Sequence, residues 1–296
     1  MIDKFIIRGN NMSYQPIIII GAPRSGTNML RDVLCELEGV GTWPCDEINY
    51  IWRHGNIEKD TDEFSAEMLT PKIKKYIQNE FDSIAKKYDL EYVVEKTCAN
   101  SLRVPFVDAA VPNAKYIFIY RDGVDAAGSA KKRWTAKLDI PYILKKVKYV
   151  PFTDLPYYGF KYFFNRVYRV FSKEERLAFW GPKFNGLDEA LEQYSLEEVS
   201  ALQWKKCVDA SENAFQNMPN TQVIRVKYEN FVTNPQEELQ RILSSLNVSY
   251  DNSNIENIVS SVTSKSIGKG RQAFDEMQTK KITKLVEDTL RRYGYQ

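Results

Sequence analysis

Several patterns that would place the chain in a common class of protein are missing from its 296 residues. The four cysteines include no C-x-x-C pair, which argues against a zinc site or a disulfide framework and indicates reduced thiols in a cytosolic protein. No apolar run is as long as a membrane span, and the polar residues 1–15 lack the apolar core of a signal peptide. We therefore expect a cytoplasmic protein without a transmembrane segment.

The chain also lacks an excess of charge of either sign. It has 41 basic and 39 acidic residues, which leaves a net charge of +2 and argues against a general nucleic-acid binder. Any anion site must therefore be local. Histidine is nearly absent, with His54 alone, and no cluster of ligand side chains indicates a metal site. A hydrophobic content of 43% is sufficient for a full core, and we expect one domain over residues 1–296.

The most informative stretch is residues 17–30, where four isoleucines lead into a glycine-containing turn and then an amphipathic helical pattern. Strand, loop and helix in this order are typical of a phosphate-binding loop, in which free N–H groups at the helix N-terminus attract an anion. In the nucleotide-hydrolysing version a Lys follows the second Gly, but Thr27 follows Gly26 here. The loop therefore predicts a phosphate that is held rather than transferred. Further donors are the side chains of Arg24, Ser25, Thr27 and Asn28.

Strand-like segments alternate with helical ones along most of the chain, which favours an α/β fold with a parallel sheet. We expect strands at residues 16–21, 92–95, 115–120 and 222–226. Ligands of such sheets bind outside the carboxyl ends of the strands. The loop at Gly21, the segment at Lys96 and the segment at Arg121 should therefore lie together. Residues 138–190 break the alternation, and we expect a helical insertion that covers the site.

A second candidate anion site begins where the third strand ends. Arg121 closes that strand, Ser129 lies in the following helix, and Arg133 lies one helical turn after Ser129 on the same face. Two guanidinium groups and a hydroxyl could converge on one phosphate, because the planar donor fork of Arg suits phosphate oxygens. The alternative is a surface ion pair between Arg121 and an Asp, next to an ordinary helix.

Together, the two anion sites resemble the sulfotransferase family, whose cofactor is 3′-phosphoadenosine 5′-phosphosulfate (PAPS). The resemblance implies a three-layer α/β sandwich with a central parallel sheet and a P-loop-like loop. It also implies that residues 24–28 (Arg24, Ser25, Gly26, Thr27 and Asn28) bind the 5′-phosphosulfate. Arg121, Ser129 and Arg133 would then hold the 3′-phosphate.

The resemblance extends to other positions and is nearest to the protein-tyrosine and bacterial branch. Lys96 resembles its catalytic lysine, and Asp46-Glu47 resembles its acidic pair, in which the second member is the base. Tyr228 resembles its nucleotide-contacting tyrosine, and Gly268-Lys269 resembles its C-terminal nucleotide-closing loop. The cytosolic branch has a Trp in that loop and a His base, and this chain lacks that Trp, so the aromatic residue that stacks on adenine stays open.

The resemblance implies transfer of a sulfuryl group from PAPS to a hydroxyl group of a saccharide, lipid or small alcohol. Glu47 would accept the proton, with Asp46 or His54 as alternative bases, and Lys96 and Arg24 would stabilise the leaving oxygen. The aromatic and basic residues 142–184 would contribute to acceptor specificity or to peripheral membrane contact. Two other functions stay open: a P-loop kinase or NTPase, and a non-catalytic nucleotide-binding protein.

Overall fold

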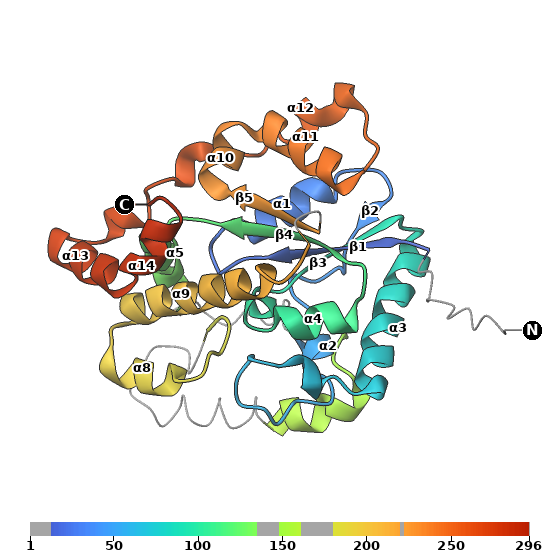
Figure 1. Ribbon diagram of the computed structural model, residues 1–296, viewed down its shortest axis with the longest axis horizontal. Helices are drawn as coiled ribbons and strands as arrows, with labels where there is room; N and C mark the ends of the chain where they lie inside the picture. Colours follow the sequence, from blue (N-terminus) through green and yellow to red (C-terminus); the bar gives the residue numbers. More distant parts are fainter. Residues whose placement is uncertain (1–12, 135–147, 161–179, 220–221, 296) are drawn as a thin grey trace, which may run out of the picture.

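The computed structural model describes residues 13–134, 148–160, 180–219 and 222–295. Its centre is a five-stranded sheet in the order β2-β3-β1-β4-β5, in which every neighbouring pair is parallel (Figure 1). This confirms the predicted α/β fold with a parallel sheet. The strands are β1 (Gln15–Ile20), β2 (Val40–Gly41), β3 (Tyr92–Lys96), β4 (Lys115–Tyr120) and β5 (Val223–Lys227).

Two separate apolar cores lie on the two faces of the sheet, because successive side chains of a strand point to opposite faces. Ile18 and Ile20 of β1 belong to one core, and Ile17 and Ile19 belong to the other. The helices within residues 71–134 and 196–215 contribute to the first core, and those within residues 27–34 and 228–258 contribute to the second (Figure 1). The molecule is therefore a three-layer sandwich, as predicted.

The helices that flank the sheet differ in length from 4 to 20 residues. Those along the first half of the chain are α1 (Thr27–Leu34), α2 (Asn49–Arg53), α3 (Pro71–Tyr88), α4 (Val104–Ala110) and α5 (Gly123–Trp134). Those along the second half are α8 (Leu187–Gln193), α9 (Leu196–Phe215), α10 (Tyr228–Thr233), α11 (Pro235–Leu246), α12 (Ile255–Ile258), α13 (Glu276–Leu285) and α14 (Glu287–Arg292).

Strand β1 lies between β3 and β4, and this position decides where the site is. Ile19 pairs with Lys96 of β3 on one side and with Ile117 of β4 on the other. The chain then leaves β1 for α1 in one outer layer and leaves β4 for α5 in the opposite layer. Ligands of doubly wound sheets bind in the crevice where two neighbouring strands connect to opposite layers.

Some local expectations were wrong. The two-residue strand β2 at the edge of the sheet was not predicted, because Val40 and Gly41 are too few for a period-2 pattern. The segment between β3 and β4 begins with a 3₁₀ turn, Cys98–Leu102, which is followed by α4, with Pro105 in the first turn of α4. Of the expected insertion at 138–190, residues 155–160 are helical, and residues 138–147 and 161–179 lie outside the described part.

Candidate functional site

The loop between β1 and α1 has the backbone conformation that its glycines permit. Gly26, at the N-cap of α1, has a φ of 89°, which disfavours side chains with a Cβ. A Cβ on Gly21 would lie 2.6 Å from the backbone oxygen of Ile119, so glycine there lets the loop pack directly on β4. Arg24 also has a positive φ, 68°, although it is not a glycine. Such strained residues cluster at ligand sites, where the surrounding structure holds them.

One hydroxyl group in this loop is buried without a partner. Ser25 is completely buried, and its Oγ has no hydrogen-bond partner within the described structure. An unsatisfied buried polar atom costs free energy, so its presence in a loop of this kind points to a ligand. The neighbouring Thr27 is buried beside the Cys98 thiol, with Oγ1 and Sγ 3.7 Å apart, and Asn28 is exposed on the first turn of α1.

Lys96, the last residue of β3, lies in a buried ion-pair cluster. Its Nζ donates to Oε1 of Glu47 at 3.0 Å and to Oδ1 of Asp46 at 3.3 Å, and its side chain is only 1% exposed. Burial alone would lower the pKa of Lys96, but the charge of Glu47 and the other acidic neighbours raises that pKa above its ordinary value. Lys96 is therefore a permanent positive charge at neutral pH.

Glu47 is held in place by the segment that follows Lys96. The backbone N–H of Cys98 donates to Oε1 of Glu47 at 3.2 Å, and the N–H of Ile48 donates to Oγ1 of Thr97 at 3.2 Å. The family resemblance assigned Glu47 and Lys96 to one reaction, but it did not predict these two backbone contacts, because no side-chain pattern reports on backbone N–H groups. The carboxylate of Glu47 therefore has a fixed orientation beside the Lys96 ammonium.

Arg31 is a site residue that the sequence reasoning missed. Its Nη1 donates to the backbone oxygen of Asp46 at 3.0 Å and to Oδ1 of Asp46 at 2.8 Å. It lies four residues after Thr27, one helical turn along α1, and this spacing was the available signal. Arg31 joins the segment of the acidic pair to the helix that begins at the phosphate loop.

The two predicted anion sites meet at Arg24 and Ser129. Nε of Arg24 donates to Oγ of Ser129 at 3.0 Å, across 105 residues of sequence. Burial lowers the pKa of Arg24, and the positive charges of Arg133 and Arg121 lower it further. Arg133 is exposed on α5. Arg24 therefore lies close enough to two other arginines to be repelled by them, and a bound anion would offset this repulsion.

Arg121 is more enclosed than a simple phosphate-binding arginine. Its Nε donates to Oδ2 of Asp125 at 3.0 Å, its Nη1 donates to the backbone oxygen of Arg24 at 3.0 Å, and its Nη2 donates to that of Ser266 at 2.6 Å. The ion pair with Asp125, considered above as a surface feature, is present, but both partners are buried. Arg121 thus connects β4, the phosphate loop and the C-terminal segment.

Tyr228 and the segment around Gly268 contact the two partners of the Arg121–Asp125 ion pair. The guanidinium carbon of Arg121 lies 4.4 Å from the ring centroid of Tyr228, and a Cβ on Gly26 would lie 2.5 Å from that ring. Tyr228 is buried at the start of α10. The N–H of Gly268 donates to Oδ2 of Asp125 at 3.2 Å, whereas Lys269 is exposed.

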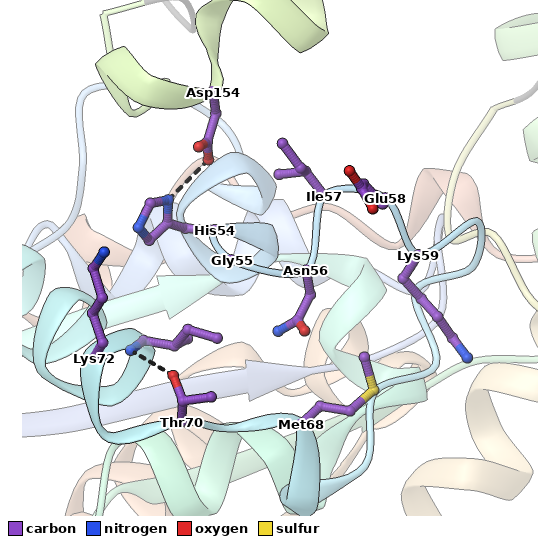
Figure 2. Close-up of a pocket in the computed structure, with 11 residues that line it drawn as sticks. His54, Gly55, Asn56, Ile57, Glu58, Lys59, Met68, Thr70, Lys72 and Asp154 are labelled. Atoms are coloured by element: carbon purple, nitrogen blue, oxygen red, sulfur yellow. Dashed lines mark hydrogen bonds and ion pairs between the residues drawn. The ribbon is translucent and has the colours of Figure 1, made fainter.

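His54 is not a solvated loop residue. Its Nδ1 lies 2.9 Å from Oδ2 of Asp154, and its ring lies 4.2 Å from that of Tyr76. The pair lines a hollow of about 660 Å³ together with Lys59 and Lys72, and Figure 2 shows how these side chains lie. Both partners of His54, Asp154 and Tyr76, come from elements other than those that carry Lys96 and Glu47.

The described residues contain no group of three or more His, Cys, Asp and Glu side chains that could hold a metal ion. Within the same ranges, no helix is both long and apolar enough to cross a membrane. The site thus consists of a helix N-terminus with several cationic side chains, next to a lysine–carboxylate pair. Such a site can bind an anionic group and neutralise charge that develops on an oxygen atom.

Comparison with known structures shows the same fold in several sulfotransferases. The sulfotransferase domain of the olefin synthase from Synechococcus PCC 7002 has a TM-score of 0.54 at 13% identity, covering 93% of this chain and 96% of that one. The sulfotransferase domain from the curacin biosynthetic pathway gives 0.53 at 14% identity, covering 93% and 98%. The sulfotransferase STF9 from Mycobacterium avium gives 0.53 at 11% identity, covering 95% and 77%. These identities support similarity of fold only.

Comparison of the sequence with family models identifies the family of the chain. No curated protein sequence matches the chain. The model of the sulfotransferase family matches residues 16–158 and 165–252, a span that includes β1 from Pro16 onward, the other four strands, the phosphate loop and the segments at Lys96 and Arg121. The chain therefore belongs to the sulfotransferase family.

Proposed function

We propose that the protein transfers the sulfuryl group of PAPS to a hydroxyl group of an acceptor molecule. The observation that carries this proposal is the buried Lys96–Glu47 pair at the end of β3, next to the loop at the end of β1. The Lys96 ammonium and the Glu47 carboxylate thus lie next to the phosphate loop, which carries the cationic side chain of Arg24. These are the two groups that sulfuryl transfer to a hydroxyl requires: one for the leaving oxygen and one for the proton.

The residues present fit PAPS. A bound anion would accept from the buried, partnerless hydroxyl of Ser25 and would offset the repulsion of Arg24 by Arg121 and Arg133. In this proposal residues 24–28 hold the 5′-phosphosulfate, and Arg121, Ser129 and Arg133 hold the 3′-phosphate. Tyr228 and the pair Gly268-Lys269 flank the nucleoside. When bound, PAPS supplies a sulfuryl group attached to a phosphate that is a good leaving group.

Lys96 and Arg24 would neutralise the oxygen between phosphate and sulfate. Both are held in advance, Lys96 by Glu47 and Arg24 by Ser129, so little reorganisation is needed during the reaction. The raised pKa of Lys96 means that the side chain keeps its proton at neutral pH and acts by its charge. Removing one such preorganised donor typically lowers turnover by about 10²–10³-fold.

Glu47 would accept the proton of the acceptor hydroxyl. Its side chain is 26% exposed, whereas that of Lys96 is 1% exposed, so an acceptor can reach the carboxylate from solvent. The N–H of Cys98 and the ammonium of Lys96 fix the direction of Oε1. The acceptor is proposed only as a class, a hydroxyl compound such as a saccharide, lipid or small alcohol.

A binding and transfer experiment tests the function. Thermal shift with adenosine 3′,5′-bisphosphate, ATP and buffer distinguishes a sulfotransferase site from a kinase site, and labelled PAPS with a panel of hydroxyl acceptors then measures transfer. We expect stabilisation by the bisphosphate and transfer to at least one acceptor class. Stabilisation by ATP alone would support a P-loop kinase instead. Binding of the bisphosphate without transfer to any acceptor would support a non-catalytic nucleotide-binding protein.

A further inference from the structure

The Asp125 side chain occupies an anion site that the protein itself builds. Its Oδ2 accepts from Nε of Arg121 at 3.0 Å and from the N–H of Gly268 at 3.2 Å. Its Oδ1 accepts from the N–H of Arg271 at 3.3 Å and also from that of Gly270. One carboxylate therefore satisfies a guanidinium group and three backbone N–H groups, and Asp125 is only 2% exposed.

The three N–H groups belong to residues 264–271, which we call the C-terminal loop. This loop lies about 145 residues after Asp125 in the sequence, so the contact is tertiary. Hydrogen bonds from N–H groups to a carboxylate are charge-assisted, and such bonds are about twice as strong as neutral ones. Loss of the negative charge would leave several buried donors without a suitable acceptor.

The backbones of α5 and the C-terminal loop touch directly at two glycines. A Cβ on Gly128 would lie 2.1 Å from the backbone oxygen of Gly270, and a Cβ on Gly270 would lie 1.9 Å from the backbone oxygen of Asp125. Neither contact leaves room for any side chain. The loop is therefore seated on α5 by shape as well as by the Asp125 carboxylate.

Arg121 extends this contact to the phosphate loop. The same guanidinium group that pairs with Asp125 donates to the backbone oxygens of Arg24 and Ser266. Three segments that are distant in sequence are thus joined through one ion pair. Asp122 adds a second link, because its Oδ2 accepts from Nε and Nη2 of Arg271 at 2.9 and 2.6 Å.

We infer that Asp125 is a positioning residue of the cofactor site, which holds the C-terminal loop on α5 and orients Arg121 before any cofactor is bound. The inference rests on the proposed function only for the identity of that cofactor. The loop carries Lys269, one of the residues proposed to flank the nucleoside. A loop that is already seated would bind the nucleotide without first having to be ordered, which strengthens binding.

The test is the Asp125→Asn variant, examined by native limited proteolysis and by binding of adenosine 3′,5′-bisphosphate. Trypsin can cut the C-terminal loop after Lys265, Lys269 and Arg271, and mass spectrometry separates these cuts from those elsewhere. At a temperature well below the melting point, we expect cleavage in the loop at least ten times faster than in the wild type. We also expect bisphosphate affinity to fall by about tenfold or more, as charge-assisted contacts are lost.

A matched control and a second variant complete the experiment. Asp108→Asn removes another carboxylate with internal hydrogen bonds, from Tyr116 and Gln222, and should leave loop cleavage and affinity unchanged. Gly270→Ala displaces the loop without changing any charge and should also give fast cleavage. This second variant keeps the inference testable if Asp125→Asn does not fold.

The outcomes separate the two proposals. Wild-type rates of loop cleavage in both Asp125→Asn and Gly270→Ala would overturn the inference. Fast cleavage with unchanged bisphosphate affinity would overturn the positioning role, because the loop would then be seated for stability alone. A wild-type protein that binds no bisphosphate would overturn the proposed function, while the cleavage rates would still decide whether Asp125 holds the loop.

Discussion

At the scale of single residues, the site is defined by charges that are paired before any ligand is present. Lys96 pairs with Glu47, Arg24 is hydrogen-bonded to Ser129, and Arg121 pairs with Asp125. Buried charges are costly unless they are paired and hydrogen-bonded, so these contacts are needed for the fold as well as for chemistry. The paired arrangement also fixes each side chain in one direction.

Glu47→Gln is expected to distinguish the role of Glu47 as proton acceptor from nucleotide binding. The amide keeps the size of the side chain but cannot act as a base, so turnover should fall by about 10²–10⁴-fold. Bisphosphate binding, which depends on other residues, should stay unchanged. Steady-state kinetics with the best acceptor, together with a bisphosphate titration, measures both quantities.

His54→Ala is the control for this substitution. Its partner Asp154 lies in the 3₁₀ turn Phe152–Asp154, and neither residue belongs to the Lys96–Glu47 cluster. The variant should retain most of the wild-type turnover. An active Glu47→Gln protein beside an inactive His54→Ala protein would assign the base to His54 instead.

At the scale of elements, the phosphate loop depends on what packs beneath it. Gly26 is the N-cap of α1, and the Tyr228 ring of α10 lies where its Cβ would be. Gly186 offers a matched comparison, because it is the N-cap of α8 with nearly the same φ, 88°, and nothing lies within 4 Å of its Cβ position. The two positions share the conformational requirement and differ in packing.

Gly26→Ala should therefore destabilise the protein more than Gly186→Ala. The positive φ costs both variants about 1 kcal/mol, and overpacking against Tyr228 adds roughly 1–3 kcal/mol at position 26. Urea unfolding gives the two free energies. Only Gly26→Ala should weaken bisphosphate binding. Equal losses of stability in the two variants would show that Tyr228 does not support the loop.

At the scale of the whole molecule, a buried carboxylate near the centre of the sheet makes the free energy of unfolding depend on pH. Glu95 of β3 is 1% exposed and accepts from Oγ1 of Thr97 at 2.6 Å and from Nδ2 of Asn100 at 2.8 Å. Burial raises the pKa of Glu95 from 4.5 to about 7, although the bond from Thr97 acts in the opposite direction. The native protein therefore holds this proton more tightly than the unfolded chain does.

The free energy of unfolding should accordingly fall as the pH rises from 4.5 to 7. The contribution of Glu95 is fully present below pH 4.5 and is lost above pH 7, and its size is on the order of 3 kcal/mol. Glu95→Gln should remove this part of the pH dependence. The control Glu287→Gln changes an exposed glutamate that is paired with Arg291, and it should keep the pH dependence. Urea unfolding at pH 5, 6 and 7 measures the slopes. Identical slopes in Glu95→Gln and the wild type would contradict the prediction.

The sequence alone was sufficient for the parallel α/β fold, for the loop at residues 21–28 and for the strand ends at Lys96 and Arg121. These features depend on local patterns: apolar runs form strands, glycines permit the turn, and parallel strands place their carboxyl ends on one edge. The resemblance to sulfotransferases suggested the roles of the site residues, and the match to the family model confirmed that the chain belongs to that family. The roles of individual residues stay predictions.

Only the tertiary structure decided which groups touch. The strand order places β1 beside β4 and β2 beside β3, and the segments that follow these strands bring Arg24 to Ser129 and Glu47 to Lys96. Asp125 had no distinguishing pattern beyond its spacing from Arg121, because its partners are backbone N–H groups about 145 residues away. Backbone donors carry no sequence signature, and their positions are set by how distant segments pack.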